Sequence, residues 1–526
     1  MLSSIAFLNG RVYTQEVGQP LARAIGVLGN RIAAVGSDDE VLAALPSRAE
    51  RVDLHGRAVL PGFVDAHFHL LQYCRSRERL RLDGVASLDA VRELVARAVG
   101  TASPGSWVLG GGWDRSLWGG EFPTRGDLDA VSGERPVCLF SRDVHAVWVN
   151  TVGLELAGIR RETPDRPGGR ILRELDGTPS GILLEAAGQP VRDLADRPSL
   201  EASIALVRQY QDDLPRVGLT ALHNLEGALA LRALESLELA GALRLRVFAG
   251  LWREALEAIT TVGLHTGFGG DRLRIGLLKL FADGSLGSGT AALLAPYEGC
   301  PNDCGIATAD RDELVELMRR ARAAGIGVAT HAIGDAAVRT VLDAAEVVRA
   351  DPDGQDQILR IEHAQLVDPE DLARFGRLDV IASMQPSHAT SDRLIAERGW
   401  GARCKTGYPW RSLLDGGAQL AFGSDCPVEP PDPLRGIHAA VTRQRDGEPA
   451  DGWYPEQRLS VAEAIRAATL GSARAAGLGH EQGSIAPSKL ADLVVLGRDP
   501  YATPPAELAE IDVLMTVFDG QVVYTA

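Results

Sequence analysis

The stretch Val59-Leu60-Pro61-Gly62-Phe63-Val64-Asp65-Ala66-His67-Phe68-His69 guides the interpretation of the whole chain. Its apolar residues after the Pro-Gly break predict a buried strand that ends in two histidines. Because side chains two residues apart point to the same face of a strand, His67 and His69 lie side by side and can share a metal ion. A His-x-His pair also ends strands by chance, so a metal site requires partners from elsewhere in the chain.

The composition is that of a globular α/β protein with an acidic surface. The 526 residues are enough for a barrel with an insertion and a side domain. Asp and Glu number 70 against 54 Lys and Arg, which argues against a nucleic-acid partner or an anionic membrane surface. Residues 1–13 lack the basic run of a signal peptide, and no apolar run is long enough to span a membrane. We expect a cytoplasmic protein that binds a small molecule, with a homodimer left open.

The middle of the chain alternates short apolar strands with helical patterns, which predicts βα units around a parallel sheet. Eight such strands favour a (β/α)8 TIM-like barrel, in which catalytic residues lie at the C-terminal ends of the strands. The candidate strands span residues 63–66, 220–223, 246–249, 275–281, 327–331, 360–363, 380–385 and 419–424.

The two ends of the chain and one long connection lie outside this pattern. Residues 1–58 and 484–526 contain short strands, and we expect them to form one composite β-sandwich because neither end alone can bury a core. The barrel would then occupy residues 59–483. The first two barrel strands are separated by far more residues than one crossover needs, which predicts an insertion at about 74–214. Rooted in the first βα loop, this insertion would lie over the barrel mouth as a lid.

Polar side chains gather at the predicted strand ends in numbers that suit a metal centre. His67, His69 and Asp425 would hold one divalent cation, most simply zinc. His331 and His363 end successive strands and would hold a second ion, since barrel geometry makes those ends converge. Each residue has a simpler alternative: the two histidines could be satisfied core residues, and Asp425 could cap a following helix.

Lys279 lies inside the apolar run 275–281, where an uncompensated charge is costly. An ammonium group cannot bind a cation. Carboxylated by carbon dioxide, however, the lysine becomes an anion with two oxygens that can bridge two metal ions. The alternative is a buried ion pair between Lys279 and Asp283.

Several motifs extend this set over nearly the whole chain. They are residues 61–69, 279–288, 330–335, 361–364, 423–425, 430–434, 483–486 and 491–493. Together they resemble the amidohydrolase superfamily, specifically the group of metal-dependent amidohydrolases that includes N-substituted formamide deformylase. The resemblance implies that the family ligands fall on His67, His69, Lys279, His331, His363 and Asp425.

The resemblance further implies a hydrolase that cleaves a non-peptide carbon–nitrogen bond of the amide type with one or two divalent cations. Asp425 would act as the general acid and base. Alternatives on the same scaffold are a deaminase of a heterocycle and an esterase or lactonase. Fold alone does not exclude a non-catalytic binding protein. Residues on loops or strand ends that could contact the substrate are His145, Trp113, Asp114, His223, Gln385 and His388.

Overall fold

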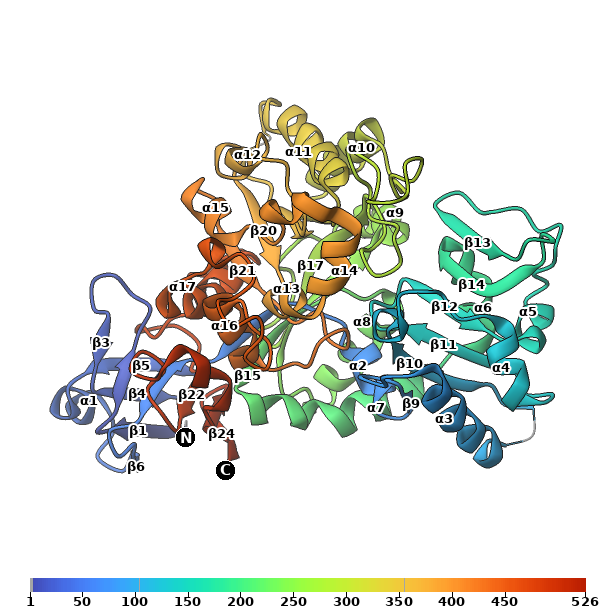
Figure 1. The fold of residues 1–526 in the computed structure, drawn as a ribbon. Coiled ribbons are helices and arrows are strands. Elements are labelled where there is room, and N and C mark those ends of the chain that lie inside the picture. Colours follow the sequence, from blue (N-terminus) through green and yellow to red (C-terminus); the bar gives the residue numbers. More distant parts are fainter. Residues whose placement is uncertain (1–2, 104, 354) are drawn as a thin grey trace.

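An eight-stranded parallel sheet occupies the centre of the computed structural model, which describes residues 3–103, 105–353 and 355–526 (Figure 1). The strands neighbour one another in chain order, and each neighbouring pair is parallel. They are β8 (Phe63–Phe68), β15 (Leu219–Asn224), β16 (Arg246–Trp252), β17 (Leu273–Phe281), β18 (Val328–Ala332), β19 (Leu359–His363), β20 (Val380–Met384) and β21 (Leu420–Phe422). The predicted TIM-like barrel is confirmed, with all eight strands where the sequence predicted them.

The first and last strands meet just beyond their carboxyl ends. The amide of Asp425 donates to the carbonyl of His67 at 2.8 Å, and the amide of His69 donates to the carbonyl of Cys426 at 3.0 Å. The seam between β8 and β21 therefore closes at the two histidines and the aspartate that the sequence predicted as ligands.

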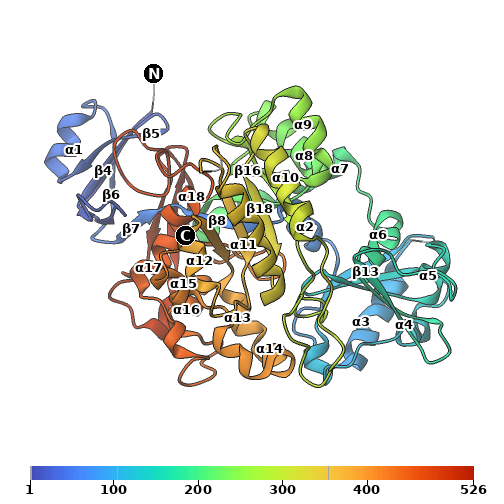
Figure 2. The same cartoon turned by 90° about the horizontal axis from the view of Figure 1, so that it is seen from above.

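Helices follow the barrel strands and cover the outside of the sheet (Figures 1 and 2). They include α8 (Ala228–Leu239), α9 (Leu256–Val262), α10 (Arg311–Ala323), α11 (Asp335–Arg349), α12 (Leu372–Arg377), α13 (Pro386–Ser391), α14 (Arg393–Trp400), α15 (Trp410–Asp415), α16 (Pro433–Thr442) and α17 (Val461–Arg466). Helix α11 buries Val338, Val341, Leu342 and Ala345, spaced by three and four residues as one apolar face requires. Among the helices that the structure describes, none has both the length and the apolar character of a membrane span.

Both ends of the chain contribute to two sheets at one end of the molecule. The first has the order β5 (Arg31–Gly36), β4 (Ala24–Leu28), β1 (Ser4–Leu8), β6 (Glu50–Asp53). The second has the order β24 (Gln521–Thr525), β23 (Val513–Phe518), β22 (Leu493–Leu496), β7 (Ala58–Pro61), β2 (Arg11–Tyr13), β3 (Leu21–Ala22). Phe7, Val27 and Leu493 belong to one buried cluster, so segments from both ends share a core.

The predicted start of the barrel at residue 59 is wrong by a few residues. Residues 59–61 belong to β7, which pairs with β22 in the terminal sheet, and the barrel begins at Phe63. Gly62 lies between the two strands, and its amide donates to the carbonyl of Asp492. A glycine is required there because a Cβ would lie 2.3 Å from Oγ1 of Thr220. One apolar run in the sequence therefore forms two strands, β7 in the terminal sheet and β8 in the barrel.

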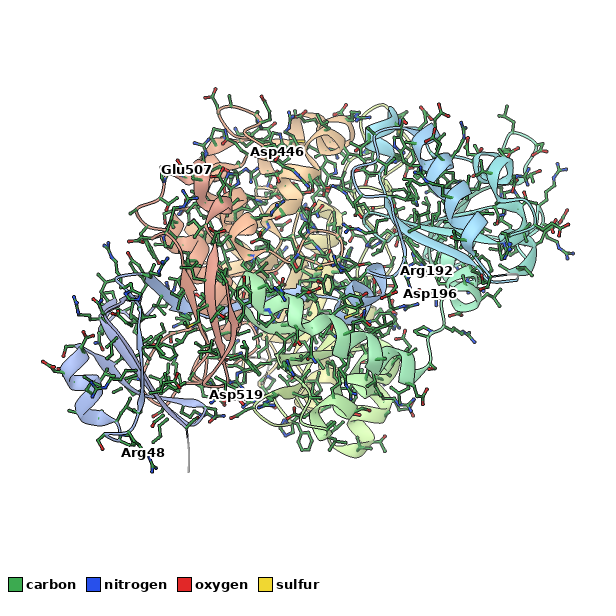
Figure 3. The ribbon with its side chains drawn as sticks, turned by 90° about the horizontal axis from the view of Figure 1, so that it is seen from below. Arg48, Arg192, Asp196, Asp446, Glu507 and Asp519 are labelled. Atoms are coloured by element: carbon green, nitrogen blue, oxygen red, sulfur yellow. The ribbon has the colours of Figure 1, made fainter. Side chains whose placement is uncertain are left out.

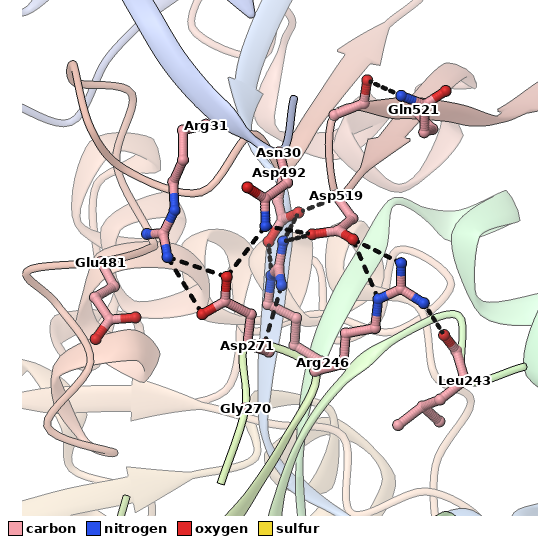
Figure 4. Close-up of polar contacts among 12 residues, drawn as sticks. Asn30, Arg31, Leu243, Arg246, Gly270, Asp271, Glu481, Asp492, Asp519 and Gln521 are labelled. Atoms are coloured by element: carbon pink, nitrogen blue, oxygen red, sulfur yellow. Dashed lines mark hydrogen bonds and ion pairs between the residues drawn. The ribbon is translucent and has the colours of Figure 1, made fainter. Parts of the chain in front are cut away.

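Charged side chains join the terminal sheet to the base of the barrel (Figure 4). Arg246, at the first residue of β16, is paired with Asp492 at 2.5 Å and with Asp519 at 3.0 Å. Arg272 also pairs with Asp519, at 2.7 Å. Since Asp492 and Asp519 come from the C-terminal part of the chain, this network fixes that end to the strand bases.

A third sheet lies between β8 and β15 in the sequence and projects from the opposite side of the barrel to the terminal sheets (Figures 1 and 2). Its order is β13 (Gly169–Arg173), β14 (Pro179–Glu185), β12 (Ala146–Val149), β11 (Val137–Ser141), β10 (Val108–Trp113), β9 (Leu80–Arg81). The helices of this region are α2 (Leu70–Ser76), α3 (Leu88–Thr101), α4 (Arg125–Ser132), α5 (Thr151–Leu156), α6 (Gln189–Ala195) and α7 (Leu200–Tyr210). We refer to residues 77–199 as the insertion.

Candidate metal centre

Two histidines and an aspartate converge where the barrel closes. Nε2 of His67 lies 3.4 Å from Oδ1 of Asp425, and Nε2 of His69 lies 3.2 Å from the same oxygen. The three candidate ligand atoms all lie within 4.8 Å of one another. The two histidines predicted to lie side by side, His67 and His69, are thus found close together at the end of β8, and Asp425 lies next to them in the loop after β21.

The tautomer of His67 is set by Glu362. Nδ1 of His67 donates to Oε2 of Glu362 at 2.7 Å, and both side chains are almost completely buried. Burial lowers the pKa of His67 to about 4, and the charge of Lys279 acts in the same direction. The ring is therefore neutral, and its Nε2 points a lone pair at the carboxylate of Asp425. Two facing lone pairs at this distance repel unless a cation lies between them.

The other two predicted histidines extend the group along the barrel rim. The ring centroids of His67 and His363 are 4.7 Å apart, and those of His363 and His331 are 4.5 Å apart. Nδ1 of His363 donates to Oε1 of Gln385 at 2.8 Å, and Nε2 of His331 donates to the carbonyl of Gly284 at 2.9 Å. Each ring thus keeps one nitrogen without a proton, and a partner on the other nitrogen is typical of metal-binding histidines.

Electrostatics keep these two rings neutral as well. Burial lowers the pKa of His331 and of His363 well below the usual value, and neighbouring positive charge reinforces the effect. A neutral imidazole is the form that binds a metal ion.

Lys279 is buried on β17 among these groups, with 2% of its surface exposed. Burial lowers its pKa to about 8, although the charges of Glu362 and Asp425 oppose this. The alternative of an ion pair with Asp283 is wrong. Asp283 instead accepts hydrogen bonds from the amides of Ala292, Ile333 and Gly334, at the start of α11.

Residues at the end of β15 hold the turn that follows His69. Oδ1 of Asn224 accepts from the amide of Leu70 at 2.8 Å, and Glu226 accepts from the amides of Leu71 and Gln72 at 2.7 and 2.9 Å. These contacts satisfy the first amides of α2. They also place the carboxyl group of Glu226 at the N-terminal end of the helix, where the helix dipole is positive. They therefore fix the backbone immediately after the second histidine.

The insertion brings its own polar group to the site. The ring of His145 lies 5.2 Å from that of His331, and its Nδ1 donates to Oε2 of Glu185 at 2.7 Å. Glu185 also accepts from Thr290 of the barrel at 2.6 Å. Burial would lower the pKa of His145, but Glu185 and Asp143 outweigh it and raise the value to about 9. His145 is thus a cationic donor held over the site by both parts of the molecule.

Four other predicted substrate residues lie at or next to this centre. Nε2 of His388 lies 3.8 Å from Oδ2 of Asp425 and has no hydrogen-bond partner among the described residues. His363, His388 and Asp425 form a second group whose ligand atoms lie within 4.8 Å of one another. Gln385 orients His363, as described above. Trp113 and Asp114 line the cavity over the site, where Trp113 donates to the carbonyl of Leu139.

His223 is not where a substrate residue would have to be. It does not line the cavity over the metal centre. Its Nδ1 accepts a hydrogen bond from Arg360 at 2.8 Å, and its ring packs on Phe248 inside the barrel. The prediction that it contacts substrate is not supported, because the side chain points into the barrel and not out of its mouth.

Sequence reasoning missed the carboxylates that support the ligands. Glu362 pairs with the fully buried Arg360 at 2.7 Å, which holds the pKa of Glu362 well below its usual range although burial opposes it. Asp65 accepts from the amide of His67 at 3.0 Å and from the hydroxyl of Ser424 at 2.6 Å. A charge inside an apolar strand pattern, as in Ile361-Glu362, was the signal that could have found the first of them.

Two cavities adjoin the centre. The inner one, of about 50 Å³, is lined by His145, His331, His363, His388 and Asp425. The outer one, of about 800 Å³, lies between the insertion and the barrel. Asp114, Ser141, Arg142 and Val428 line both, so the two spaces share a wall.

Comparisons with known proteins point to one family of hydrolases. A model of the amidohydrolase family matches residues 50–524. The chain is 33% identical to the Arabidopsis thaliana protein LONG AFTER FAR-RED 3, over 100% of this chain and 92% of that one. It is 32% identical to N-substituted formamide deformylase of Arthrobacter pascens, over 99% and 98%. A crystal structure of an uncharacterized metal-dependent hydrolase from Pyrococcus horikoshii superposes with a TM-score of 0.78 at 32% identity, over 96% of this chain and 99% of that one.

Proposed function

The chain belongs to the amidohydrolase family, and on that basis we propose that it cleaves the carbon–nitrogen bond of a small, non-peptide amide with the help of a divalent cation. One observation carries the proposal. The lone pair of His67 Nε2 faces the carboxylate of Asp425 at 3.4 Å beside His69, an arrangement that a cation would stabilise.

The donor set suits zinc. Two imidazoles and a carboxylate are ligand types that Zn²⁺ prefers, and a third protein ligand or water can complete the coordination. Unsatisfied buried nitrogens also occur here, at His69 Nδ1 and His388 Nε2 among the described residues. A bound divalent cation supplies Lewis acidity, which activates water and polarises a carbonyl group.

Asp425 moves the proton in this mechanism. As the oxygen of water forms a bond to the amide carbon, Asp425 accepts the proton that water loses. It then delivers that proton to the nitrogen as the carbon–nitrogen bond breaks. The products are a carboxylic acid and an amine. His145 and His388 carry N–H groups at the inner cavity, where they can donate to the substrate oxygen as negative charge develops on it.

Lys279, once carboxylated, would hold a second cation together with His331 and His363. Its neutral amine would attack the carbon of carbon dioxide, form an N–C bond and pass one proton to water, which gives an anionic carbamate. A pKa lowered to about 8 by burial makes the required neutral amine more abundant than on an exposed lysine. Intact mass measured under native conditions, and again after acid treatment, tests for the added carbon dioxide without relying on activity.

The function is tested by elemental analysis combined with a product-release screen over N-formyl, N-acyl and cyclic amides. We expect one or two divalent cations per chain and release of an amine that stops on chelation and returns with zinc. His69→Asn should lower the metal content, whereas His480→Asn, at an exposed histidine, should not. A folded protein that binds no divalent cation and releases no amine would contradict the proposal, and release of ammonia from a ring would favour a deaminase.

A further inference from the structure

The inner cavity is too small for a whole substrate. Its volume of about 50 Å³ has room for roughly three or four water-sized groups. The outer cavity, at about 800 Å³, has the volume of a typical ligand site. Because Asp114, Ser141, Arg142 and Val428 line both cavities, the outer cavity is the adjoining space for the part of a substrate that is too large for the inner one.

The outer cavity contains an excess of positive charge at one place. Arg75, Arg79 and Arg192 line it, and Asp196 lies beside them. Asp196 is shared, because the same Oδ1 pairs with both Arg75 and Arg79. Among the residues that the structure describes, the ion pairs of these three guanidinium groups therefore involve a single carboxylate, that of Asp196. Figure 3 shows Arg192 and Asp196 where the insertion meets the barrel.

Arg192 is the group whose charge is least compensated. Among the described residues its side chain makes one hydrogen bond, to the carbonyl of Val144, and no ion pair. Its guanidinium carbon lies 5.0 Å from the centre of the Phe140 ring, and that of Arg79 lies 5.3 Å from the same centre. Two cations thus contact one aromatic ring. Burial lowers the pKa of Arg79 to about 9, and the charges of Arg75 and Arg192 contribute to this.

The carboxylates nearby are already engaged. Asp193 accepts from Gln189 at 2.9 Å and pairs with Arg197 at 3.6 Å. Glu226 accepts from two amides at the start of α2. Glu185 is held by His145 and Thr290. The charges of Glu185 and Asp143 act on Arg192, but neither carboxylate forms an ion pair with it, so a bound anion would complete the neutralisation of its charge.

We propose that the outer cavity holds the non-reacting part of the substrate, and that Arg79 and Arg192 bind an anionic group, a carboxylate or a phosphate, at its far end. This inference rests on the proposed function, since it assumes that the reacting amide lies at the metal centre. It narrows the substrate class to amides with an apolar or aromatic body, suited to Phe140, and a terminal negative charge.

Binding of non-reacting probes tests the inference separately from catalysis. The probes are 4-phenylbutyrate, phenyl phosphate and the neutral alcohol 4-phenylbutan-1-ol, which has no bond to hydrolyse, titrated by calorimetry into the metal-loaded enzyme. We expect at least one anion to bind about tenfold or more tightly than the alcohol, and Arg192→Gln and Arg79→Gln to remove most of that preference. Comparison of the two anions identifies the preferred group.

The control is Arg48→Gln, which removes one positive charge from the terminal sheets, far from the cavity (Figure 3), and should leave all three affinities unchanged. Equal binding of the anions and the neutral alcohol by the unmodified enzyme would overturn the inference. So would anion binding that Arg192→Gln and Arg192→Lys leave intact, because the anion would then lie elsewhere. Anion binding that depends on Arg192, in an enzyme that releases no amine, would uphold the cavity assignment while the proposed reaction failed.

Discussion

Glu362 stands next to His363 in the sequence but holds His67, whose Nδ1 donates to it at 2.7 Å. The partner histidine lies on β8, at the other end of the barrel sequence. Arg360, on the same strand as Glu362, pairs with this carboxylate at 2.7 Å and keeps it ionised. One strand therefore supplies both a candidate ligand, His363, and the carboxylate that orients a candidate ligand of a different strand, His67.

Replacement of Glu362 by Gln should weaken metal binding by about 10- to 100-fold, the usual cost of losing a carboxylate behind a metal-binding histidine. It should also destabilise the metal-free protein by about 3–5 kcal/mol, because Arg360 is left buried without a counter-charge. Chelator competition measures the first effect and denaturant unfolding the second. Glu298→Gln, at an exposed loop residue, is the control. Unchanged metal affinity in Glu362→Gln would show that Glu362 does not position His67.

Asp425→Asn should lower kcat by about 10²- to 10⁴-fold, since the amide cannot take up a proton. His67 and His69 remain, so the metal content measured by elemental analysis should stay nearly intact. Asp415→Asn, in an exposed ion pair with Arg411, should leave both quantities unchanged. Retained turnover in Asp425→Asn would remove this residue from the mechanism.

The pair of His145 and Glu185 predicts a pH dependence of stability. The pKa of His145 is raised to about 9 in the folded protein, above the value of about 6.5 in an unfolded chain. Its contribution is therefore complete below pH 6.5 and disappears as pH rises through about 9. In metal-free protein, wild type should exceed His145→Gln in unfolding free energy by at most about 3 kcal/mol at pH 6, and by little above pH 9.5. A difference that grows with pH would contradict the assignment.

Arg142 connects the insertion to the barrel, with partners on both. It pairs with Asp392 at 2.5 Å and lies 3.6 Å from Glu429, both of the barrel, and 3.5 Å from Asp114. Arg142→Met leaves the partly buried Asp114 and Asp392 without this counter-charge, whereas Glu429 keeps Arg445 at 3.4 Å. We expect KM to rise more than kcat falls, and limited proteolysis of the insertion to become faster.

The matched control for Arg142 is Arg170→Met, which breaks a half-exposed pair between the insertion and Asp303. An exposed pair contributes about 0–1 kcal/mol, so this variant should behave like wild type. Equal behaviour of the two variants would show that Arg142 has no special role in holding the insertion.

Arg246→Met should destabilise the protein by about 3–5 kcal/mol, since it leaves Asp492 without its buried partner. Arg244→Met breaks an exposed pair with Asp212 and should cost no more than about 1 kcal/mol. Chemical denaturation compares the two variants. Because Arg246 lies at the base of the barrel, kcat should be the same in both, and a large loss of kcat in folded Arg246→Met would contradict this separation.

The sequence was informative about strands and about residues at their ends. Hydrophobic patterning located all eight barrel strands, and barrel geometry then brought His67, His331 and His363 together. The hydrophobic pattern was less informative about the face of a strand to which a given side chain points. His223 is the second-to-last residue of β15, as His331 is of β18, yet it points inward to Arg360, because the strand pattern does not reveal which of two faces a residue near the strand end takes.

Contacts between distant segments could not be predicted from local pattern. The hydrogen bonds that His67 donates to Glu362 and Thr290 donates to Glu185 join residues that only the closed barrel and the packed insertion bring together. The break at Gly62 was visible as a Pro-Gly pair, but its assignment to two different sheets depends on β22, more than four hundred residues later.

That pairing of β7 with β22 also constrains synthesis of the protein. Residues 58–61 leave the ribosome early, but their hydrogen-bonding partners at 493–496 are translated near the end. Until then this apolar segment, joined directly to the histidines of the metal centre, has one edge uncovered. We therefore expect this segment to be prone to aggregation during elongation, and the sheet that contains β7 to be completed only after residues 493–496 have been made.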